Sequence, residues 1–309
     1  MIKIIKLSEQ YFGLFLISGL ALGLIYPANT SFLLPLLKPF LMVMLFLVFL
    51  KTDVPQVFQK MKNYRQAIFL ALMYMVAIPV LFFLAVNLFN QELAVGILLL
   101  TAMPAGAASP ALTDIVKGNT ALSTSIVITT SVIAPFTVPL LIWALTIEDF
   151  SIDPWLIFMD LAMLIFLPMA ASQFFKRYFP IMIGKSSHLF TSVNVILLSL
   201  MVYAVMGSQR ETILNNPLKI FWQCGFLYIV FILLHVIGFL MGYKEDKEGK
   251  IATTIGAAYM NNGMAIVLAA IYFSPSILLL LVLSEIPWNT LLVPFRKIIR
   301  KRVCDATIL

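Results

Sequence analysis

Two short segments of the chain carry residues that could hold a small anion without a charged side chain. Residues 104–110 read PAGAASP and residues 260–265 read MNNGMA. Each segment interrupts an apolar stretch of helical length. Proline lacks a backbone N–H and collides with the preceding helical turn, and Asn-Asn-Gly favours non-helical backbone. We therefore expect a break in the middle of each of these two helices.

A broken helix exposes backbone groups at its interruption that can bind a ligand. The second half begins with free backbone N–H groups at the positive end of a helix dipole, and small residues let a ligand come close to the backbone. Two such ends that face each other make an anion site. The alternative is that the small residues only permit close packing of membrane helices. The predicted substrate-binding residues are Ala107, Ala108, Ser109, Asn261, Asn262 and Gly263.

The elements that position these residues are apolar helices. Hydrophobic residues make up 61% of the 309 residues and charged residues only 11%, whereas soluble domains carry about 25% charged residues. A membrane-spanning helix needs about 20 apolar residues. The chain therefore predicts an all-α membrane protein with ten transmembrane helices, at residues 10–27, 32–50, 66–88, 93–116, 120–146, 154–174, 188–207, 219–242, 250–273 and 276–298.

The charges between these segments predict the topology. If both termini are cytoplasmic, 18 of the 21 Lys and Arg residues lie on the inner side, and only Lys38, Arg210 and Lys219 lie on the outer side. This is the positive-inside pattern. It explains the net charge of +7 without a nucleic-acid partner. We expect an uncleaved first span and a bacterial inner (plasma) membrane, with the lipid bilayer as the chain's main surroundings; the sequence assigns no oligomeric state.

The two predicted breaks lie in the fourth and ninth helices, which are five spans apart. Two five-helix repeats, residues 1–146 and 147–309, produce this spacing. An odd number of spans per repeat inverts the second half relative to the first. Paired broken helices in inverted repeats are typical of a transporter with its site at the bilayer midplane. The sequence thus predicts a carrier with alternating access.

Three sequence motifs in the fourth, fifth, ninth and tenth spans are specific enough to indicate a family. The stretch PAGAASPALTDIVKGNTALS (residues 104–123) resembles the fourth-to-fifth-span signature of the bile acid:sodium symporter family. MNNGMA is similar to the family's ninth-span stretch, and Trp288 and Asn289 have counterparts in the tenth span. The resemblance implies a core domain, in which two broken helices cross, and a panel domain. It also implies a small organic anion as substrate: a bile-acid-like molecule, a sulfated steroid or a short carboxylate.

The resemblance also implies where sodium ligands would lie, and most of them are replaced. Ser123 is kept in the fifth span, and Ser109 is kept in the fourth, but a proline follows it. Sodium favours oxygen ligands, and carboxylates are the strongest of these. We expect at most a weak sodium site, formed by Ser109, Ser123 and backbone carbonyls, and no other cofactor or metal. The replaced positions are Tyr74, Pro110, Val127, Gly256 and Met260.

Of the Asp, Glu, Lys and Arg residues within the predicted spans, Lys38, Asp160 and Glu285 lie well inside the ends, where charge is costly. Our hypothesis is that Glu285, near the middle of the tenth span, stays protonated at rest and carries a proton in place of sodium. The alternative is a neutral carboxyl group that only hydrogen-bonds to a neighbouring helix. Lys38 and Asp160 lie at similar depth from the outer side, and we predict a structural ion pair. The alternative is that Lys38 extends to the membrane surface.

Other function classes are less well supported. A membrane-embedded enzyme needs a nucleophile or a metal cluster at depth, and no such pattern of residues is present. A membrane sensor that kept the fold and lost ion coupling remains an alternative, as does a sodium-independent uniporter or a proton-coupled carrier. The interpretation that the motifs favour is a secondary transporter of a small organic anion.

Overall fold

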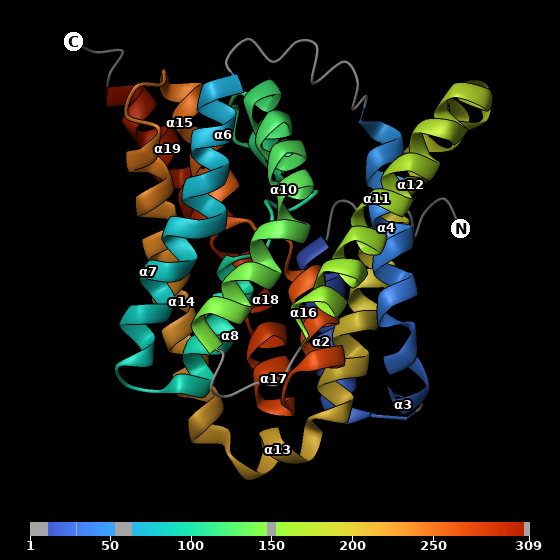
Figure 1. Ribbon diagram of the computed structural model, residues 1–309, viewed down its shortest axis with the longest axis vertical. Helices are drawn as coiled ribbons and strands as arrows, with labels where there is room; N and C mark the ends of the chain where they lie inside the picture. Colours follow the sequence, from blue (N-terminus) through green and yellow to red (C-terminus); the bar gives the residue numbers. More distant parts are fainter. Residues whose placement is uncertain (1–11, 29, 53–63, 147–152, 306–309) are drawn as a thin grey trace.

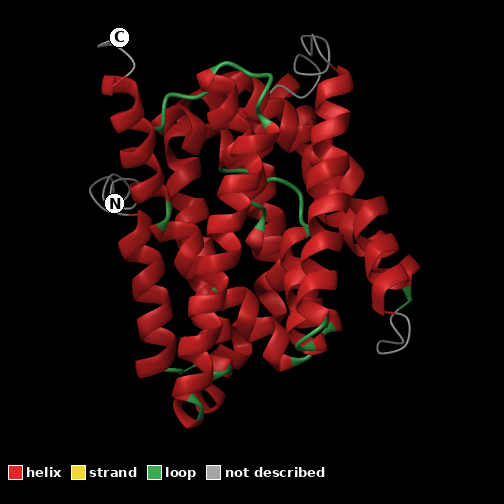
Figure 2. Ribbon diagram, turned by 90° about the vertical axis from the view of Figure 1, so that its left-hand side faces the viewer, coloured by secondary structure: helices red, strands yellow, loops and turns green. Residues whose placement is uncertain are grey.

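The computed structural model describes residues 12–28, 30–52, 64–146 and 153–305. Within these ranges every regular element is a helix, and no strand forms (Figure 2). Most of the long helices run in roughly the same direction, side by side, as Figure 1 shows. The predicted all-α class is confirmed.

Seven helices are long and apolar enough to cross a membrane, among the residues that the structure describes. They span residues 30–51, 65–87, 120–146, 154–178, 180–208, 217–241 and 275–299. Large apolar side chains, such as Trp222 and Leu240, point outward and are exposed. Because water does not favour such a surface, these faces fit contact with lipid. The chain is therefore an integral membrane protein.

The helices of the first half follow the predicted order of spans. Kinks divide two of these spans: a short 3₁₀ turn lies in the second and a π-helical turn, Met73–Ala77, in the third. The helices are α2 (Phe12–Ile25), α3 (Thr30–Leu33), α4 (Leu37–Lys51), α6 (Tyr64–Leu72), α7 (Ile78–Asn87), α8 (Gln91–Thr101), α9 (Ser109–Ile115) and α10 (Thr120–Thr146).

The second half of the chain also consists of long and short helices. They are α11 (Pro154–Tyr178), α12 (Pro180–Ser208), α13 (Arg210–Asn215), α14 (Pro217–Met241), α15 (Lys247–Ala258), α16 (Asn262–Tyr272), α17 (Pro275–Leu283), α18 (Glu285–Thr290) and α19 (Leu292–Asp305).

Both predicted helix breaks are present, and they lie against each other. The first separates α8 from α9, and the second separates α15 from α16. Ala105 and Met260 form an antiparallel bridge, in which the N–H of Gly106 donates to the carbonyl of Tyr259 (2.7 Å) and the N–H of Asn261 donates to Pro104 (2.8 Å). Backbone groups at membrane depth must be satisfied within the protein. Each break therefore supplies the hydrogen bonds that the other has lost.

The helices pack in two groups. In one, α12 packs along α2 and α4, and α4 packs along α11. In the other, α8 packs on α7 and α17, α15 packs on α10 and α14, and α16 packs on α17. The helix α8 is almost entirely buried in the second group. The two breaks therefore lie in the interior of this second group.

Two glycines bring α2 and α12 close together in the first group. A Cβ atom added to Gly19 would lie 2.6 Å from the carbonyl oxygen of Ser199, and one added to Gly23 would lie 2.8 Å from that of Tyr203. Small residues four positions apart allow this close approach between membrane helices. The contact makes α2 and α12 a tightly packed pair.

Replacing Gly106 by alanine tests the pairing of the two breaks. The added Cβ would lie 2.7 Å from the carbonyl oxygen of Tyr259, so the backbone bridge has to open. We expect Gly106→Ala to destabilise the protein by about 1–3 kcal/mol, as overpacking does in tight interiors. Thermal unfolding in detergent measures this loss. Gly184→Ala is the control, because open space surrounds Gly184; equal midpoints for the two variants would contradict the prediction.

Candidate functional site

A cavity of about 450 Å³ lies beside the two helix breaks. It extends from Gly106 and Asn261 at the breaks to Lys51 and Thr52 at the end of α4. Lys51 is exposed, so the cavity reaches the molecular surface at that end. Its size falls within the range of about 300–1,000 Å³ that is typical of small-molecule sites.

The side walls of the cavity are mainly apolar. Leu41, Met44, Leu45 and Val48 of α4 line one wall at the spacing of a single helix face. Residues of α12, including Leu198, line another part. A ligand that fills this space needs an apolar body.

Five of the six predicted substrate-binding residues line this cavity: Ala107, Ala108, Asn261, Asn262 and Gly263. Ser109 does not line it. Its side chain is fully buried, and its hydroxyl donates to the carbonyl of Tyr259 at 3.1 Å. In the structure this serine supports the bridge between the breaks.

Residues from both breaks line the same cavity and carry backbone N–H groups that helix formation has left free. Within the described parts of the chain, the N–H groups of Ala107, Ala108 and Gly263 make no backbone hydrogen bond, and all three residues line the cavity. The side chain of Asn261 caps α16 by accepting from the N–H of Met264 (3.2 Å). Free donors at a helix start attract an anion. The geometry is therefore that of an anion site without a guanidinium group.

Asn262 adds an unsatisfied polar atom to this space. Its side-chain nitrogen donates to the hydroxyl of Ser284 at 3.0 Å. Its side-chain oxygen has no hydrogen-bond partner, although the residue is only 4% exposed. A buried polar atom without a partner is rare in native proteins. This oxygen can therefore accept a hydrogen bond, either from a ligand that enters the cavity or from a neighbouring group that becomes protonated.

Glu285 lies at the floor of the same cavity and is 2% exposed. Its carboxyl group accepts a hydrogen bond from the side chain of Asn289 at 3.1 Å. The indole N–H of Trp288 donates to the carbonyl of Met260 at 3.1 Å, which joins α18 to the second break. The carboxyl group and the helix breaks are therefore held in one unit.

The residues at the implied sodium positions already have partners within the protein. The hydroxyl of Ser123 accepts from that of Thr113 at 3.0 Å, and the phenol of Tyr74 donates to the carbonyl of Thr253 at 2.8 Å. A Cβ atom added at Gly256 would lie 3.2 Å from the ring of Tyr74. The tyrosine thus packs against Gly256, one of the positions at which the resemblance implies a sodium ligand. None of the residues at these positions carries a carboxylate: Tyr74, Ser109, Pro110, Ser123, Val127, Gly256 and Met260.

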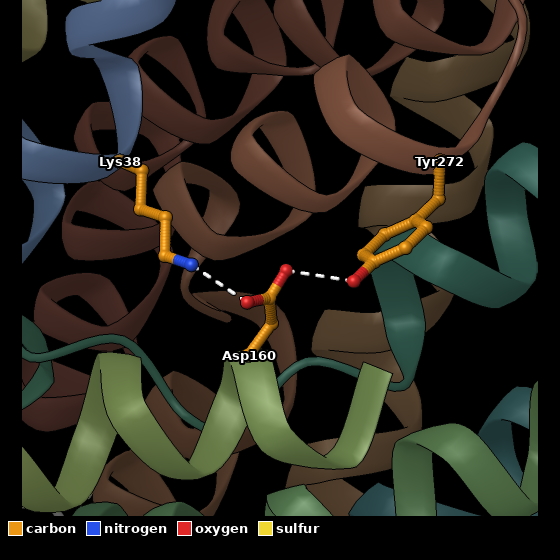
Figure 3. A network of polar contacts seen from close by, with 3 residues as sticks. All are labelled: Lys38, Asp160 and Tyr272. Atoms are coloured by element: carbon orange, nitrogen blue, oxygen red, sulfur yellow. Dashed lines mark hydrogen bonds and ion pairs between the residues drawn. The ribbon is translucent and has the colours of Figure 1, made fainter. Parts of the chain in front are cut away.

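A second polar cluster lies away from the cavity. The ammonium of Lys38 donates to one oxygen of Asp160 at 2.6 Å, and the hydroxyl of Tyr272 donates to the other oxygen at 2.7 Å (Figure 3). The predicted pair is therefore in contact, and Tyr272 is an additional member. These residues come from α4, α11 and α16, so the cluster joins the two packing groups.

Sequence reasoning missed Lys51, Thr191 and Asn194 as cavity residues. The ammonium of Lys51 donates to the hydroxyl of Thr191 at 2.8 Å, and the side-chain oxygen of Asn194 is buried without a partner. Lys51 follows the last apolar residue of the second predicted span, which was the available signal. The two α12 residues carry no comparable pattern.

Comparison with known proteins gives consistent matches. The sequence profile of the Sodium Bile acid symporter family matches residues 38–216. The uncharacterized sodium-dependent transporter YocS of Bacillus subtilis is 29% identical over 88% of this chain and 85% of its own length. The probable sodium/metabolite cotransporter BASS1, chloroplastic, of Arabidopsis thaliana is 26% identical over 58% of this chain and 45% of its own length. The family match covers more than half of the chain.

Replacing Trp288 tests how firmly α18 holds the second break. Trp288→Phe removes one of two donors to the buried carbonyl of Met260, which also accepts from the N–H of Asn262 at 3.0 Å. The loss of one such hydrogen bond costs about 0.5–1.5 kcal/mol. We expect a lower unfolding temperature in detergent. Trp222→Phe is the matched control, because Trp222 is 68% exposed. Equal stability of the two variants would show that the indole hydrogen bond contributes nothing.

Proposed function

Because the chain belongs to the sodium bile acid symporter family, we propose that it is a secondary transporter of a small organic anion that works by alternating access. The proposal includes ten spans in two inverted repeats, residues 1–146 and 147–309. The fourth span consists of α8 and α9, and the ninth consists of α15 and α16. The two packing groups correspond to a core, which contains the breaks, and a panel, which contains α2, α4, α11 and α12.

One observation carries this proposal: Ala107, Ala108 and Gly263, whose N–H groups make no backbone hydrogen bond among the described residues, line one cavity. They come from both breaks, which lie far apart in the sequence. Half-helix N-termini that meet at a repeat interface are the usual anion site of such transporters. Paired small residues that served packing alone would face other helices and not a cavity.

The substrate class follows from the lining of the cavity. The N–H donors fit a carboxylate, sulfate or sulfonate group, and the walls formed by α4 fit an apolar body. Lys51 at the mouth adds a positive charge that favours an anion. These features support a bile-acid-like molecule, a sulfated steroid or a short carboxylate.

The orientation of the cavity fits one state of the transport cycle. The positive-inside pattern favours a cytoplasmic side for the end of α4 that carries Lys51, together with both termini. The cavity reaches the surface at this end, so this is an inward-facing state. The Lys38–Asp160–Tyr272 cluster lies near the opposite end of α4, where it closes the outer side by joining α16 to α4 and α11.

Two alternatives concern the coupling of transport. In one, the protein is a uniporter that uses no ion. In the other, it is a sensor that binds the anion without moving it. Net uptake of an anion into vesicles supports a carrier over a sensor, and accumulation against a concentration gradient supports coupling over uniport.

Uptake by proteoliposomes tests the proposed function. Taurocholate, oestrone sulfate and pyruvate represent the three substrate classes. We expect at least one of them to enter and to show saturable counterflow. If none of the three is transported or stabilises the purified protein, the proposal is wrong.

The charge of Lys51 at the cavity mouth leads to a prediction about the apparent affinity for the transported anion. Lys51→Gln keeps a polar group near Thr191 but removes the charge at the cavity mouth. Lys51 is exposed at the mouth, and an exposed charge pair contributes about 0.2–1 kcal/mol, so we expect the apparent affinity for the anion to fall by about two- to five-fold. Lys185→Gln is the control, because Lys185 is exposed and lies outside the cavity. An unchanged affinity for Lys51→Gln would contradict the prediction.

The outer cluster makes a prediction about conformation. Tyr272→Phe removes the one hydroxyl by which α16 holds Asp160 (Figure 3). Loss of this charge-assisted bond, about 1.5–3 kcal/mol, shifts the equilibrium toward the outward-facing state by about ten-fold or more. We expect faster labelling of Ala107→Cys by an impermeant maleimide that is added outside cells.

The labelling experiment uses a background in which Cys224 and Cys304 are replaced. Tyr243→Phe is the control, because Tyr243 is exposed and distant from the cluster in sequence. Equal labelling rates in the two phenylalanine variants would show that the cluster does not restrain the outer side.

A further inference from the structure

Glu285 is the only acidic residue that lines the cavity in the described part of the chain. It begins α18, one residue after Ser284, and is almost fully buried. No ion pair is formed with it among the described residues, where the pair of Lys38 and Asp160 is the one found. A buried, unpaired carboxylate is unfavourable in a medium of low dielectric constant. The surroundings of Glu285 therefore favour its neutral form.

Two amides lie beside Glu285. The side chains of Asn262 and Asn289 both contact the Glu285 carboxyl group. Each has a buried side-chain oxygen without a hydrogen-bond partner. A carboxylate donates no hydrogen bond, whereas a carboxylic acid donates one. The nitrogen of Asn289 donates to the carboxyl oxygen, which can accept in either protonation state, whereas a protonated Glu285 also offers one donor, enough for one of the two unsatisfied oxygens.

The charged and titratable groups around α18 are few. On α14, Tyr228 bonds to Thr290 and His235 bonds to Tyr259. The helix α17 contributes no such group, and α19 contributes Arg296 and Lys297. Across the cavity, Lys51 bonds to Thr191. None of these groups forms an ion pair with Glu285, so a change in its protonation changes the charge of the cavity floor directly.

Asn262 connects this carboxyl group to the anion site. It contacts Glu285 on one side, and on the other it is followed by Gly263, whose N–H is free at the cavity. An ionised Glu285 repels an anion at these N–H groups, and a neutral one does not. By reciprocity, a bound anion makes protonation of Glu285 more favourable to the same extent.

From this arrangement we propose that Glu285 binds a proton that crosses the membrane together with the organic anion. The inference rests on the proposed transport function and specifies its coupling ion. The proton adds to one carboxylate oxygen in the loaded carrier and leaves from the same oxygen after the anion has departed. The anion and the proton together carry no net charge for a monovalent substrate. The implied sodium positions, which Tyr74 and Gly256 occupy, play no part in this cycle.

The proton site is tested first without a substrate. Infrared difference spectra of the purified protein, taken between acidic and alkaline buffer, report the carbonyl stretch of a protonated carboxylic acid. The other carboxyl groups of the chain titrate as well, so we compare the variants with the wild type. We expect one component of the band to be present in the wild type and in Glu211→Gln, whose residue is exposed, and to be absent from Glu285→Gln. Identical bands in the wild type and Glu285→Gln would overturn the proposal.

The coupling is tested in proteoliposomes with the three probe anions. A pH difference of about one unit is a ten-fold proton gradient, which sustains about ten-fold accumulation of a monovalent anion in one-to-one symport. We expect the wild type and Glu211→Gln to accumulate the anion with the pH gradient, and with NaCl or KCl alike. Glu285→Gln should keep counterflow and lose accumulation.

The outcomes separate this inference from the function on which it rests. Accumulation that requires a sodium gradient, or that persists in Glu285→Gln, overturns the proton proposal and leaves the transporter intact. Absence of any transport in the wild type overturns the proposed function, while the infrared titration still decides whether Glu285 is the proton-binding group.

Discussion

The backbone pairing of the two helix breaks is the interaction on which the rest of the structure depends. A helix interrupted at membrane depth leaves N–H and C=O groups that lipid cannot satisfy. The bonds from Gly106 to Tyr259 and from Asn261 to Pro104 satisfy some of them, and those left over face a cavity. Ser109 and Trp288 add donors to the carbonyls of the second break. One arrangement thus stabilises the interruption and leaves donors for a ligand.

Much of this fold could be predicted from residue types alone. Pro104 and the pair Asn261–Asn262 interrupt helices for local reasons, so the breaks were visible in the sequence. The contact of Lys38 with Asp160 was also predictable, because two opposite charges at one depth in lipid have few other partners. Tyr272 was not predictable, since its partner depends on how α16 lies against α11. The direction of Ser109 depends in the same way on the rotation of α9 about its axis.

Tyr74 and Gly256 stand at two positions where the resemblance implies sodium ligands, and they pack against each other. The ring of Tyr74 fills the space beside the glycine, and its hydroxyl satisfies the carbonyl of Thr253. A glycine alone would leave a void, and a tyrosine alone would collide with a longer side chain. The two residues therefore fit only as a pair, and this explains why the fold tolerates both replacements. The candidate anion site at the breaks, in contrast, keeps its small residues.

The helix α4 makes a different contact at each of its two ends. Lys38, in its first turn, belongs to the outer cluster, and Lys51, its last residue, lies at the cavity mouth. The two residues are 13 positions apart, which is about 20 Å along a helix. If α4 tilts as a rigid body about its middle, its two ends move in opposite directions. In the proposed transport cycle, a tilt of α4 and α11 that draws the Lys38–Asp160 pair away from Tyr272 narrows the mouth beside Lys51 at the same time. The outer and inner openings then exclude each other, and no signal has to pass through the core.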